Sequence, residues 1–419
     1  MTHFGIICPP SPGHLNPMTT LGFELQQSGH RVTVIGVEDA RAKAEAAGLG
    51  FSAVAQAEYP LGFTKEVFAK LGSLTGIRAM KFTIDSINRG AKIILDYVPE
   101  IVKNQSIEVL LVDQATCEGG TVAEHCQIPF ISMCSAIMLN KELAVPPCVT
   151  SWQYNSSWIG LLRNYLAYSV MGLGRRPLLK TINSYRRKWR LQPYLNIDQT
   201  YSQLAQICQQ PAEFEFPRNE LPSNFYFTGS FNNPQSRESA DFPYDRLTGQ
   251  PLIYASLGTL QNRLLGIFEN MIEACRELDV QLVIALGGGL QPESLVKSAE
   301  GTSTIVVGYA PQLDLLQKAD LTITHAGMNT ALESLSSGVP MVAIPITNDQ
   351  PAVAARIVWT GTGEAIAPGE VTPQKLREKI QQVLSNHAYK KNALDLQQAM
   401  QKAGGAKRAV DIIEQALAN

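Results

Sequence analysis

Polar side chains in the last third of the chain have the composition of a diphosphate-binding site. His325 follows an apolar segment, residues 321–324, that is predicted to be a buried strand, and a helix is expected directly after it. A ligand beyond this strand would meet the helix N-terminus, where free N–H groups and a partial positive charge favour phosphate. Gly327 lets the backbone approach closely, and Asn329 and Thr330 can cap the helix and donate to phosphate oxygens. His325 can donate as a neutral ring or as a cation.

Side chains around this turn favour a nucleotide as the ligand. Glu333, about one turn into the helix, can accept hydrogen bonds from two ribose hydroxyls, and Tyr309 offers a flat face for a base. By itself, a His-Ala-Gly turn is also compatible with an ordinary strand–helix connection. The segments Tyr309-Ala-Pro-Gln312 upstream and Asp349-Gln350 downstream, in register with the turn, favour a ligand-binding site over an ordinary connection.

A candidate catalytic base lies near the N-terminus. Of the six histidines, His14 alone is placed in a glycine-flanked loop after the first predicted strand, residues 4–8, and open α/β sheets bind ligands at that edge. A positioned histidine contributes about 10²–10⁴-fold as a general base. Asp113 ends another predicted strand of the same sheet, so it can orient the ring of His14. The alternatives are a loop histidine bonded to the backbone for His14 and a helix N-cap for Asp113.

The elements that position these residues follow a β-α-β pattern. Residues 4–8 and 31–37 are predicted strands, with a helix between them that is capped by Asn16, has Pro17 in its first turn and ends near Gly29. The pattern restarts after a stretch rich in proline and polar residues. We therefore expect an α/β protein with two Rossmann-like, doubly wound parallel sheets that face each other across a cleft.

A length of 419 residues also indicates two domains, because single cores stop growing near ~250–300 residues. The predicted division is an N-terminal acceptor-binding domain at 1–235, a linker at 236–250, a C-terminal nucleotide-sugar-binding domain at 251–395, and a C-terminal helix at 396–419 that packs back toward the N-terminal domain.

Composition excludes several classes of protein. The formal net charge of −2 gives no indication of nucleic-acid binding. The seven cysteines are scattered without a C-x-x-C pair, which favours reduced thiols in a cytoplasm over a disulfide framework or a zinc site. No basic segment followed by an apolar one marks a secretory signal, and no apolar run approaches the ~20 residues of a membrane span. A cytoplasmic protein is expected.

The middle of the chain is unusual in its charge. Residues 151–197 are rich in tryptophan, tyrosine, arginine and lysine and hold no acidic residue before Asp198. One interpretation is a solvated pair of basic helices. The other is a surface, within 151–190, that faces a membrane or captures a lipophile, because basic residues beside aromatic ones suit an anionic interface.

Residues 309–350 resemble the signature box of the family 1 UDP-glycosyltransferases, which have the GT-B fold. The resemblance extends over essentially the whole chain, through Gly13-His14 and Ser256-Leu-Gly-Thr259. Within the family, the chain is most similar to bacterial members that act on lipophilic alcohols, such as zeaxanthin glucosyltransferases. Macrolide and flavonoid glycosyltransferases share the same motifs.

The resemblance implies a role for each matching position. Uracil would stack on Tyr309 and bond the backbone of Ala310, and the ribose would be held by Gln312 and Glu333. The remaining implied donor-binding residues are Ser256, Gly258, Thr259, His325, Gly327, Asn329 and Thr330 around the diphosphate, and Asp349 and Gln350 at the sugar hydroxyls. Two positions depart from the pattern of many plant members, which have tryptophan in place of Tyr309 and of Thr347.

The resemblance further implies an inverting transfer in one in-line displacement. His14 would remove the acceptor proton, Asp113 would orient His14, and an α-linked UDP-hexose, glucose in the first place, would yield a β-O-glycoside. The implied acceptor is a lipophilic hydroxylated molecule of the carotenoid, sterol, macrolide or polyphenol class. The chain has no D-x-D motif, so no metal and no cofactor is expected beyond the UDP-sugar co-substrate. A nucleotide-sugar epimerase on the same fold and a non-catalytic nucleotide-sugar-binding protein remain alternatives.

Overall fold

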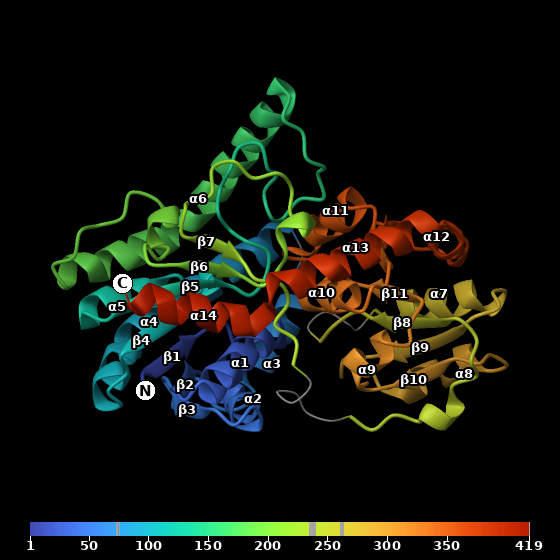
Figure 1. Ribbon diagram of the computed structural model, residues 1–419, viewed down its shortest axis with the longest axis horizontal. Helices are drawn as coiled ribbons and strands as arrows, with labels where there is room; N and C mark the ends of the chain where they lie inside the picture. The colour runs from blue at the N-terminus through green and yellow to red at the C-terminus, as the bar shows by residue number, and fades with distance from the viewer. Residues whose placement is uncertain (73, 75, 234–239, 260–263, 419) are drawn as a thin grey trace.

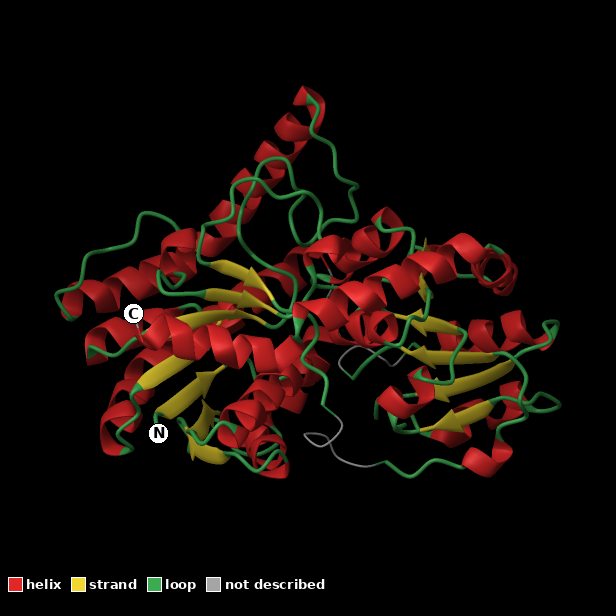
Figure 2. Cartoon of the chain, in the orientation of Figure 1, coloured by secondary structure: helices red, strands yellow, loops and turns green. Residues whose placement is uncertain are grey.

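Two parallel β-sheets, each covered by helices on both faces, form the two halves of the molecule (Figure 1, Figure 2). The structure, a computed structural model, describes residues 1–72, 74, 76–233, 240–259 and 264–418. The first sheet has the strand order β3-β2-β1-β4-β5-β6-β7 and the second has the order β10-β9-β8-β11-β12-β13. The doubly wound α/β architecture expected from the sequence is confirmed.

The central strands of the first sheet are buried along their whole length, as an all-parallel sheet between two helical layers requires. Phe4 pairs with Val32 on one side and with Val109 on the other, which places β1 inside the sheet, next to the middle strand β4. The strands are β1 His3–Ile7, β2 Arg31–Gly36, β3 Gly50–Ala53, β4 Val109–Asp113, β5 Phe130–Cys134, β6 Gln206–Cys208 and β7 Phe225–Phe227. The helices of this half are α1 Pro12–Gln27, α2 Arg41–Ala46, α3 Phe63–Gly72, α4 Gly76–Asn104, α5 Glu118–Cys126 and α6 Trp158–Lys188.

The second sheet repeats this design in the C-terminal half. Its strands are β8 Leu252–Ser256, β9 Gln281–Ala285, β10 Ile305–Val307, β11 Leu321–Thr324, β12 Met341–Ala343 and β13 Gly363–Ala365. The helices are α7 Leu265–Arg276, α8 Val296–Ala299, α9 Gln312–Leu316, α10 Met328–Ser336, α11 Gln350–Trp359, α12 Pro373–Ser385, α13 His387–Ala403 and α14 Gly405–Ala418.

The last helix returns to the N-terminal half. Figure 1 shows α13 and α14 running in succession across both halves, and α14 lies against α1. Ala409 and Ile413 share a buried core with Leu21 and Leu25. The predicted linker at 236–250 falls between β7 and β8, and its first residues, 236–239, lie outside the described residues.

A further apolar core joins the two halves. Ile137 and Phe214 of the N-terminal half are buried together with Met328, Leu332 and Val353 on α10 and α11. Burial of this kind fixes how the carboxyl ends of the two sheets face each other, because apolar surface that is removed from water resists separation.

Two local predictions were wrong. Asn16 does not cap the first helix, since α1 begins at Pro12 after Ser11, and Asn16 and Pro17 lie inside it. Proline is favoured in the first turn of a helix, and Pro12 takes that place ahead of Pro17. The interpretation of residues 151–197 as a pair of basic helices also fails in its helix count, because the segment forms one helix, α6, which is interrupted neither by Gly172 nor by Pro177.

Candidate active site

A cavity of about 660 Å³ lies between the two halves, and every site residue that the sequence predicted lines it. The cavity opens at the carboxyl ends of β1 and β4 in one sheet and of β8 and β11 in the other. In both sheets these are the neighbouring strands at which the strand order reverses. Ligands of open α/β sheets bind at such switch points, because the connections on either side diverge there and leave a crevice.

His14 and Asp113 meet at this edge of the first sheet. The Nδ1 atom of His14 lies 2.9 Å from Oδ2 of Asp113 and 2.8 Å from Oγ of Ser135, and the Ser135 hydroxyl also donates to Asp113. A carboxylate only accepts hydrogen bonds, so Nδ1 of His14 carries a proton. Nε2 is therefore the ring nitrogen left for a substrate.

The position of His14 differs from the predicted loop. Its amide donates to the carbonyl of Ser11, so His14 belongs to the first turn of α1. A helical backbone holds the ring more rigidly than a loop would. Asp113 is held as well, because its Oδ1 accepts from the amide of Ala115 and caps a short 3₁₀ turn. Asp113 thus has the capping role and the contact with His14 together.

Charge around His14 favours its protonated form. Burial lowers the pKa of His14, but the charge and the hydrogen bond of Asp113, with the carboxylate of Asp349 nearby, outweigh burial and raise the pKa above its usual value. The Asp113 carboxylate is almost wholly buried, whereas about a fifth of the His14 side chain is exposed. An imidazole in these surroundings can accept a proton and hold it as a stabilised cation.

The N-terminus of α10 points into the same cavity from the opposite half. Gly327 is its N-cap and has no side-chain oxygen, which leaves the first amides of the helix available to an anion. The prediction that Asn329 and Thr330 cap the helix was wrong, because both lie inside α10. Nδ2 of Asn329 donates to the carbonyl of Gly13 at 3.0 Å and its Oδ1 accepts from Gln209 at 2.9 Å, so Asn329 connects the two halves beside His14.

His325 packs tightly between two glycines. A Cβ atom at Gly258 or at Gly327 would lie 2.6 or 2.4 Å from its Nε2 atom, so neither position has room for a side chain. Burial lowers the pKa of His325 to about 4, against an opposing hydrogen bond to the Ser256 backbone. His325 is therefore neutral at physiological pH and can serve as a neutral donor, not as a cation.

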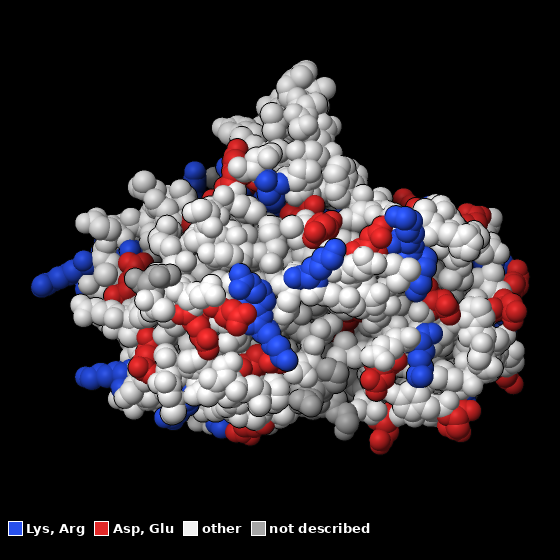
Figure 3. Space-filling model, viewed as in Figure 1, with Lys and Arg blue, Asp and Glu red and all other residues white. Residues whose placement is uncertain are grey.

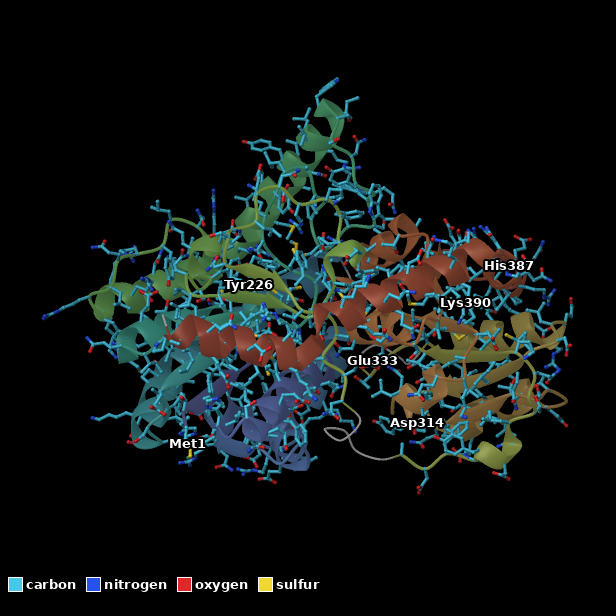
Figure 4. The ribbon with its side chains drawn as sticks, viewed as in Figure 1. Met1, Tyr226, Asp314, Glu333, His387 and Lys390 are labelled. Atoms are coloured by element: carbon cyan, nitrogen blue, oxygen red, sulfur yellow. The ribbon has the colours of Figure 1, made fainter. Side chains whose placement is uncertain are left out.

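Gln312 and Glu333 hold each other at the nucleotide end of the cavity. Nε2 of Gln312 lies 2.5 Å from Oε2 of Glu333, and the hydroxyl of Tyr254 donates to Oε1 of Gln312 at 3.0 Å. Glu333 is buried on the side of the C-terminal sheet that faces the other half (Figure 4). This chain of hydrogen bonds aligns a carboxylate and an amide with which a pair of vicinal hydroxyls can bond.

The Tyr309 ring lies beside this pair, 61% exposed, with its hydroxyl against Gly288. A Cβ atom at Gly288 would lie 2.2 Å from that hydroxyl, and Gly288 has a φ of +80°. Only glycine adopts this positive φ without strain and leaves room for the Tyr309 hydroxyl. The close approach leaves a face of the ring open to the cavity, where a flat base can stack. Ala310 follows Tyr309 in the cavity wall.

Asp349 and Gln350 lie where the cavity meets His14. Oδ2 of Asp349 is 3.4 Å from the amide of Ile137 in the other half, and burial raises its pKa despite the opposing charge of His14. Oε1 of Gln350 accepts from the amides of Ile346 and Thr347, which fixes the loop before α11.

Comparison with known proteins agrees with this geometry. The sequence profile of the family described as "UDP-glucoronosyl and UDP-glucosyl transferase" matches residues 13–404. A zeaxanthin glucosyltransferase of Pantoea ananas is 32% identical over 417 residues, 100% of this chain and 96% of the relative. A second zeaxanthin glucosyltransferase, of Pseudescherichia vulneris, is 30% identical over 100% of this chain and 98% of its own length.

The chain belongs to this family. It is a glycosyltransferase. A solved structure, described as the glycotransferase of kitacinnamycin, has the same fold, with a TM-score of 0.78 at 23% identity over 99% of this chain and 98% of that one. The two facing sheets are thus the GT-B fold that the resemblance implied.

Three residues of this glycosyltransferase site escaped the sequence analysis. Ser135, which binds both members of the His14–Asp113 pair, follows β5 directly, and β5 is the neighbour of β4. Tyr254 precedes Ser256 by two positions on β8, so the two share a face of the sheet. Both could have been found by searching the ends of predicted strands for polar residues. Gln209 directly follows β6 and donates to the carbonyl of Ser135, but no strand was predicted at residues 206–208, and only the domain contact brings Gln209 to Asn329.

The end of the cavity away from the nucleotide side is apolar. Phe68 and Leu71 of α3, Phe82 and Ile87 of α4, and Val149 line it, all from the N-terminal half. Within the described part of the chain, no group of three or more His, Cys, Asp or Glu side chains is arranged to hold a metal ion. Of the helices that the structure describes, none has the length and apolar character needed to cross a bilayer.

Proposed function

We propose that this glycosyltransferase moves a hexose, glucose in the first place, from a UDP-sugar to a hydroxyl of a lipophilic small molecule and forms a β-O-glycoside. One observation carries the proposal. The His14–Asp113 pair of one half and the N-terminus of α10 in the other half face a single cavity, so a base and a diphosphate site lie on opposite sides of the space for the sugar.

The proposed reaction is a single displacement. The acceptor oxygen forms a bond to the anomeric carbon while the bond from that carbon to the diphosphate oxygen breaks, and Nε2 of His14 takes the acceptor proton. Asp113 stabilises the imidazolium that results. The helix dipole of α10 and neutral donors, including His325, stabilise the negative charge that develops on UDP. Attack opposite the leaving group inverts the centre, and no step requires a metal.

The shape and the lining of the cavity support a lipophilic acceptor. Phe68, Leu71 and Phe82 bring an apolar wall to the end near His14, and apolar groups bind there because they leave water. Two relatives are named zeaxanthin glucosyltransferases, so a carotenoid-like alcohol is the acceptor class proposed first. Sterols, macrolides and polyphenols are the other classes. The seven cysteines are all free thiols, which supports the cytoplasm as the site of the reaction.

The alternative of an epimerase on the same fold is weakened by the apolar wall, because an epimerase has no acceptor to bind. A binding protein without catalysis would not need the buried Asp113 carboxylate beside His14, since an unreactive site gains nothing from a raised histidine pKa.

The test is to incubate the protein with UDP-glucose and a panel of hydroxylated lipophiles and to follow UDP release and product mass. We expect the wild type to form a product that is one hexose heavier than the acceptor. The His14→Ala variant should form no such product but should still bind UDP. His387→Ala is the matched control, because His387 is exposed at the start of α13, away from the cavity (Figure 4). Full turnover by His14→Ala would refute the base, and an epimerised UDP-sugar formed without acceptor would establish the alternative.

A further inference from the structure

The helix α6 projects from the molecule, and hydrogen bonds hold its inner side in place. Figure 1 shows its N-terminal half rising away from both sheets. Its inner side is fixed, because Nδ2 of Asn164 donates to the carbonyl of Leu143 at 2.8 Å and the hydroxyl of Tyr168 donates to that of Val145 at 3.2 Å. Farther along, Arg186 pairs with Glu124 at 2.8 Å. The helix is therefore a rigid projection whose outer side is presented to its surroundings.

The outer side of the N-terminal half of α6 is largely apolar, and the hydroxyl of Ser169, its exposed polar residue, donates to the carbonyl of Tyr165. Exposed side chains recur at the three- and four-residue spacing of one helix face. They are Trp158, Leu162, Tyr165, Leu166, Val170 and Leu173, a set that we name the apolar stripe. Val170 is 67% exposed and Trp158 is 73% exposed. In the view of Figure 3 the projecting end of the helix shows neither acidic nor basic side chains. An apolar surface of this extent marks an interaction site.

The same face continues as a row of cations. Arg176, Lys180, Arg187 and Lys188 are exposed along the C-terminal half of α6. No acidic residue occurs between Glu142 and Asp198 in the sequence. The outer side of one helix is thus apolar at one end and basic at the other, which is the distribution of a helix that lies in the interface of an anionic bilayer.

A second cavity, of about 510 Å³, adjoins this face. It is bordered by Leu173 and Arg176 of α6 and by Lys141 and Arg175, with Asp198 as the acidic residue among its described lining. Three cations around one carboxylate leave an excess of positive charge beside the apolar stripe. A lipid headgroup phosphate has the size and the charge to occupy such a space.

We propose that the outer face of α6 docks this glycosyltransferase on an anionic lipid bilayer without crossing it. The apolar stripe enters the headgroup region. Trp158 and Tyr165 suit the interface between the hydrocarbon core and water, because each has an apolar ring with a polar group. The cations contact anionic headgroups. A second copy of this chain is disfavoured as the occupant, because two such faces would bring like charges together.

Docking of this kind has a consequence for the acceptor, and this step alone rests on the proposed function. The loop that contacts α6 through Leu143 and Val145 also contains Val149. Val149 is half exposed and lines the main cavity. Helix α4, which supplies Phe82 and Ile87 to that cavity, packs along α6. A docked α6 places the apolar end of the cavity near the bilayer, so a lipophilic alcohol can enter from the membrane.

Vesicle flotation tests the proposal without any substrate, so its result does not depend on the proposed function. The full-length protein is expected to float with phosphatidylcholine vesicles that contain phosphatidylglycerol, to float less with pure phosphatidylcholine, and to be released by salt. Since each cation near an anionic surface strengthens binding by about fivefold, changing Arg176, Lys180, Arg187 and Lys188 together to Gln is expected to weaken binding by roughly a hundredfold or more.

The apolar contribution is tested by Leu166→Gln/Val170→Gln/Leu173→Gln, which is expected to weaken binding by at least about tenfold, because three apolar side chains no longer leave water. Val296→Gln/Leu394→Gln is the control, since it removes exposed apolar side chains elsewhere and should bind vesicles like the wild type. Equal flotation of the triple variant and the wild type would overturn the proposal. So would the absence of flotation at low salt, or a dimer in sedimentation that the triple variant abolishes.

Discussion

The buried ion pair between Glu215 and Arg356 offers the sharpest test of how the two halves are held together. Arg356 on α11 donates from Nε to Oε2 of Glu215 at 2.9 Å and from Nη2 to Oε1, and both side chains are almost wholly buried. Gln210 donates to Oε2 at 2.8 Å, and Arg218 lies 3.3 Å from Oε1. One carboxylate of the N-terminal half therefore neutralises two buried guanidinium groups, one of which belongs to the other half.

The substitution Glu215→Gln keeps the size of the side chain and removes its charge. Two buried cations then lose their counter-charge, and breaking a buried pair in this way costs about 3–5 kcal/mol. Arg356→Met should cost less, because Glu215 keeps Arg218 and Gln210 as partners. The double variant Glu215→Gln/Arg356→Met should lose less stability than the sum of the two, because the partners are coupled.

Hydrogen exchange of the α11 amides and calorimetry measure the effect. A loss of about 3 kcal/mol or more corresponds to a hundredfold or greater loss of protection. Lys391→Ala is the control, since its pair with Asp395 is exposed at 74% and 57% and is expected to contribute little. If Glu215→Gln behaves like Lys391→Ala, the reasoning about buried charge fails for this interface.

The effect of Glu215→Gln should also depend on pH. Burial raises the pKa of Glu215, but the charges of Arg356 and Arg218 outweigh burial and lower the pKa below its ordinary value of 4.5. A carboxylate with a lowered pKa stabilises the fold above its unfolded pKa, and this stabilisation is lost as the pH falls through the folded pKa. The difference between wild type and Glu215→Gln is therefore largest near pH 7 and shrinks below about pH 4.5.

Three further predictions concern the active site. The kcat/KM of the wild type should rise with pH through a midpoint above 6.5, because His14 loses its proton there. Asp113→Asn should move this midpoint to lower pH and reduce the value of kcat/KM at high pH. An unmoved midpoint would contradict the role of Asp113. Gly288→Ala should raise KM for the UDP-sugar, because its Cβ displaces the Tyr309 ring, whereas Gly301→Ala, also at positive φ but with no atom within 4 Å of its Cβ, should not. Saturating EDTA should leave turnover intact; activity lost to EDTA and restored only by Mg²⁺ or Mn²⁺ would show that a metal takes part.

Much of the fold could be predicted because its information is local. An apolar run of four or five residues indicates a buried strand, and the structure places β11 at residues 321–324, as the sequence predicted. Polar residues at the end of such strands or just after them, among them Asp113 and His325, lie at the carboxyl edge, since all strands of a parallel sheet end there. The family motif supplied the other predicted site residues, whereas the apolar lining from α3 and α4 was not predicted residue by residue.

The sequence by itself determined that the polar residues at the predicted strand ends and in the family motif gather at the cavity, because position relative to a strand end is written in the local pattern. The tertiary structure alone decided how they contact one another. Ser135 reaches His14 because β5 lies beside β4, and Asn329 reaches Gly13 because two separately folded halves dock. Arg356 finds Glu215, 141 positions away in the chain, for the same reason. Such contacts depend on strand order and domain packing, for which no local periodicity carries a signal.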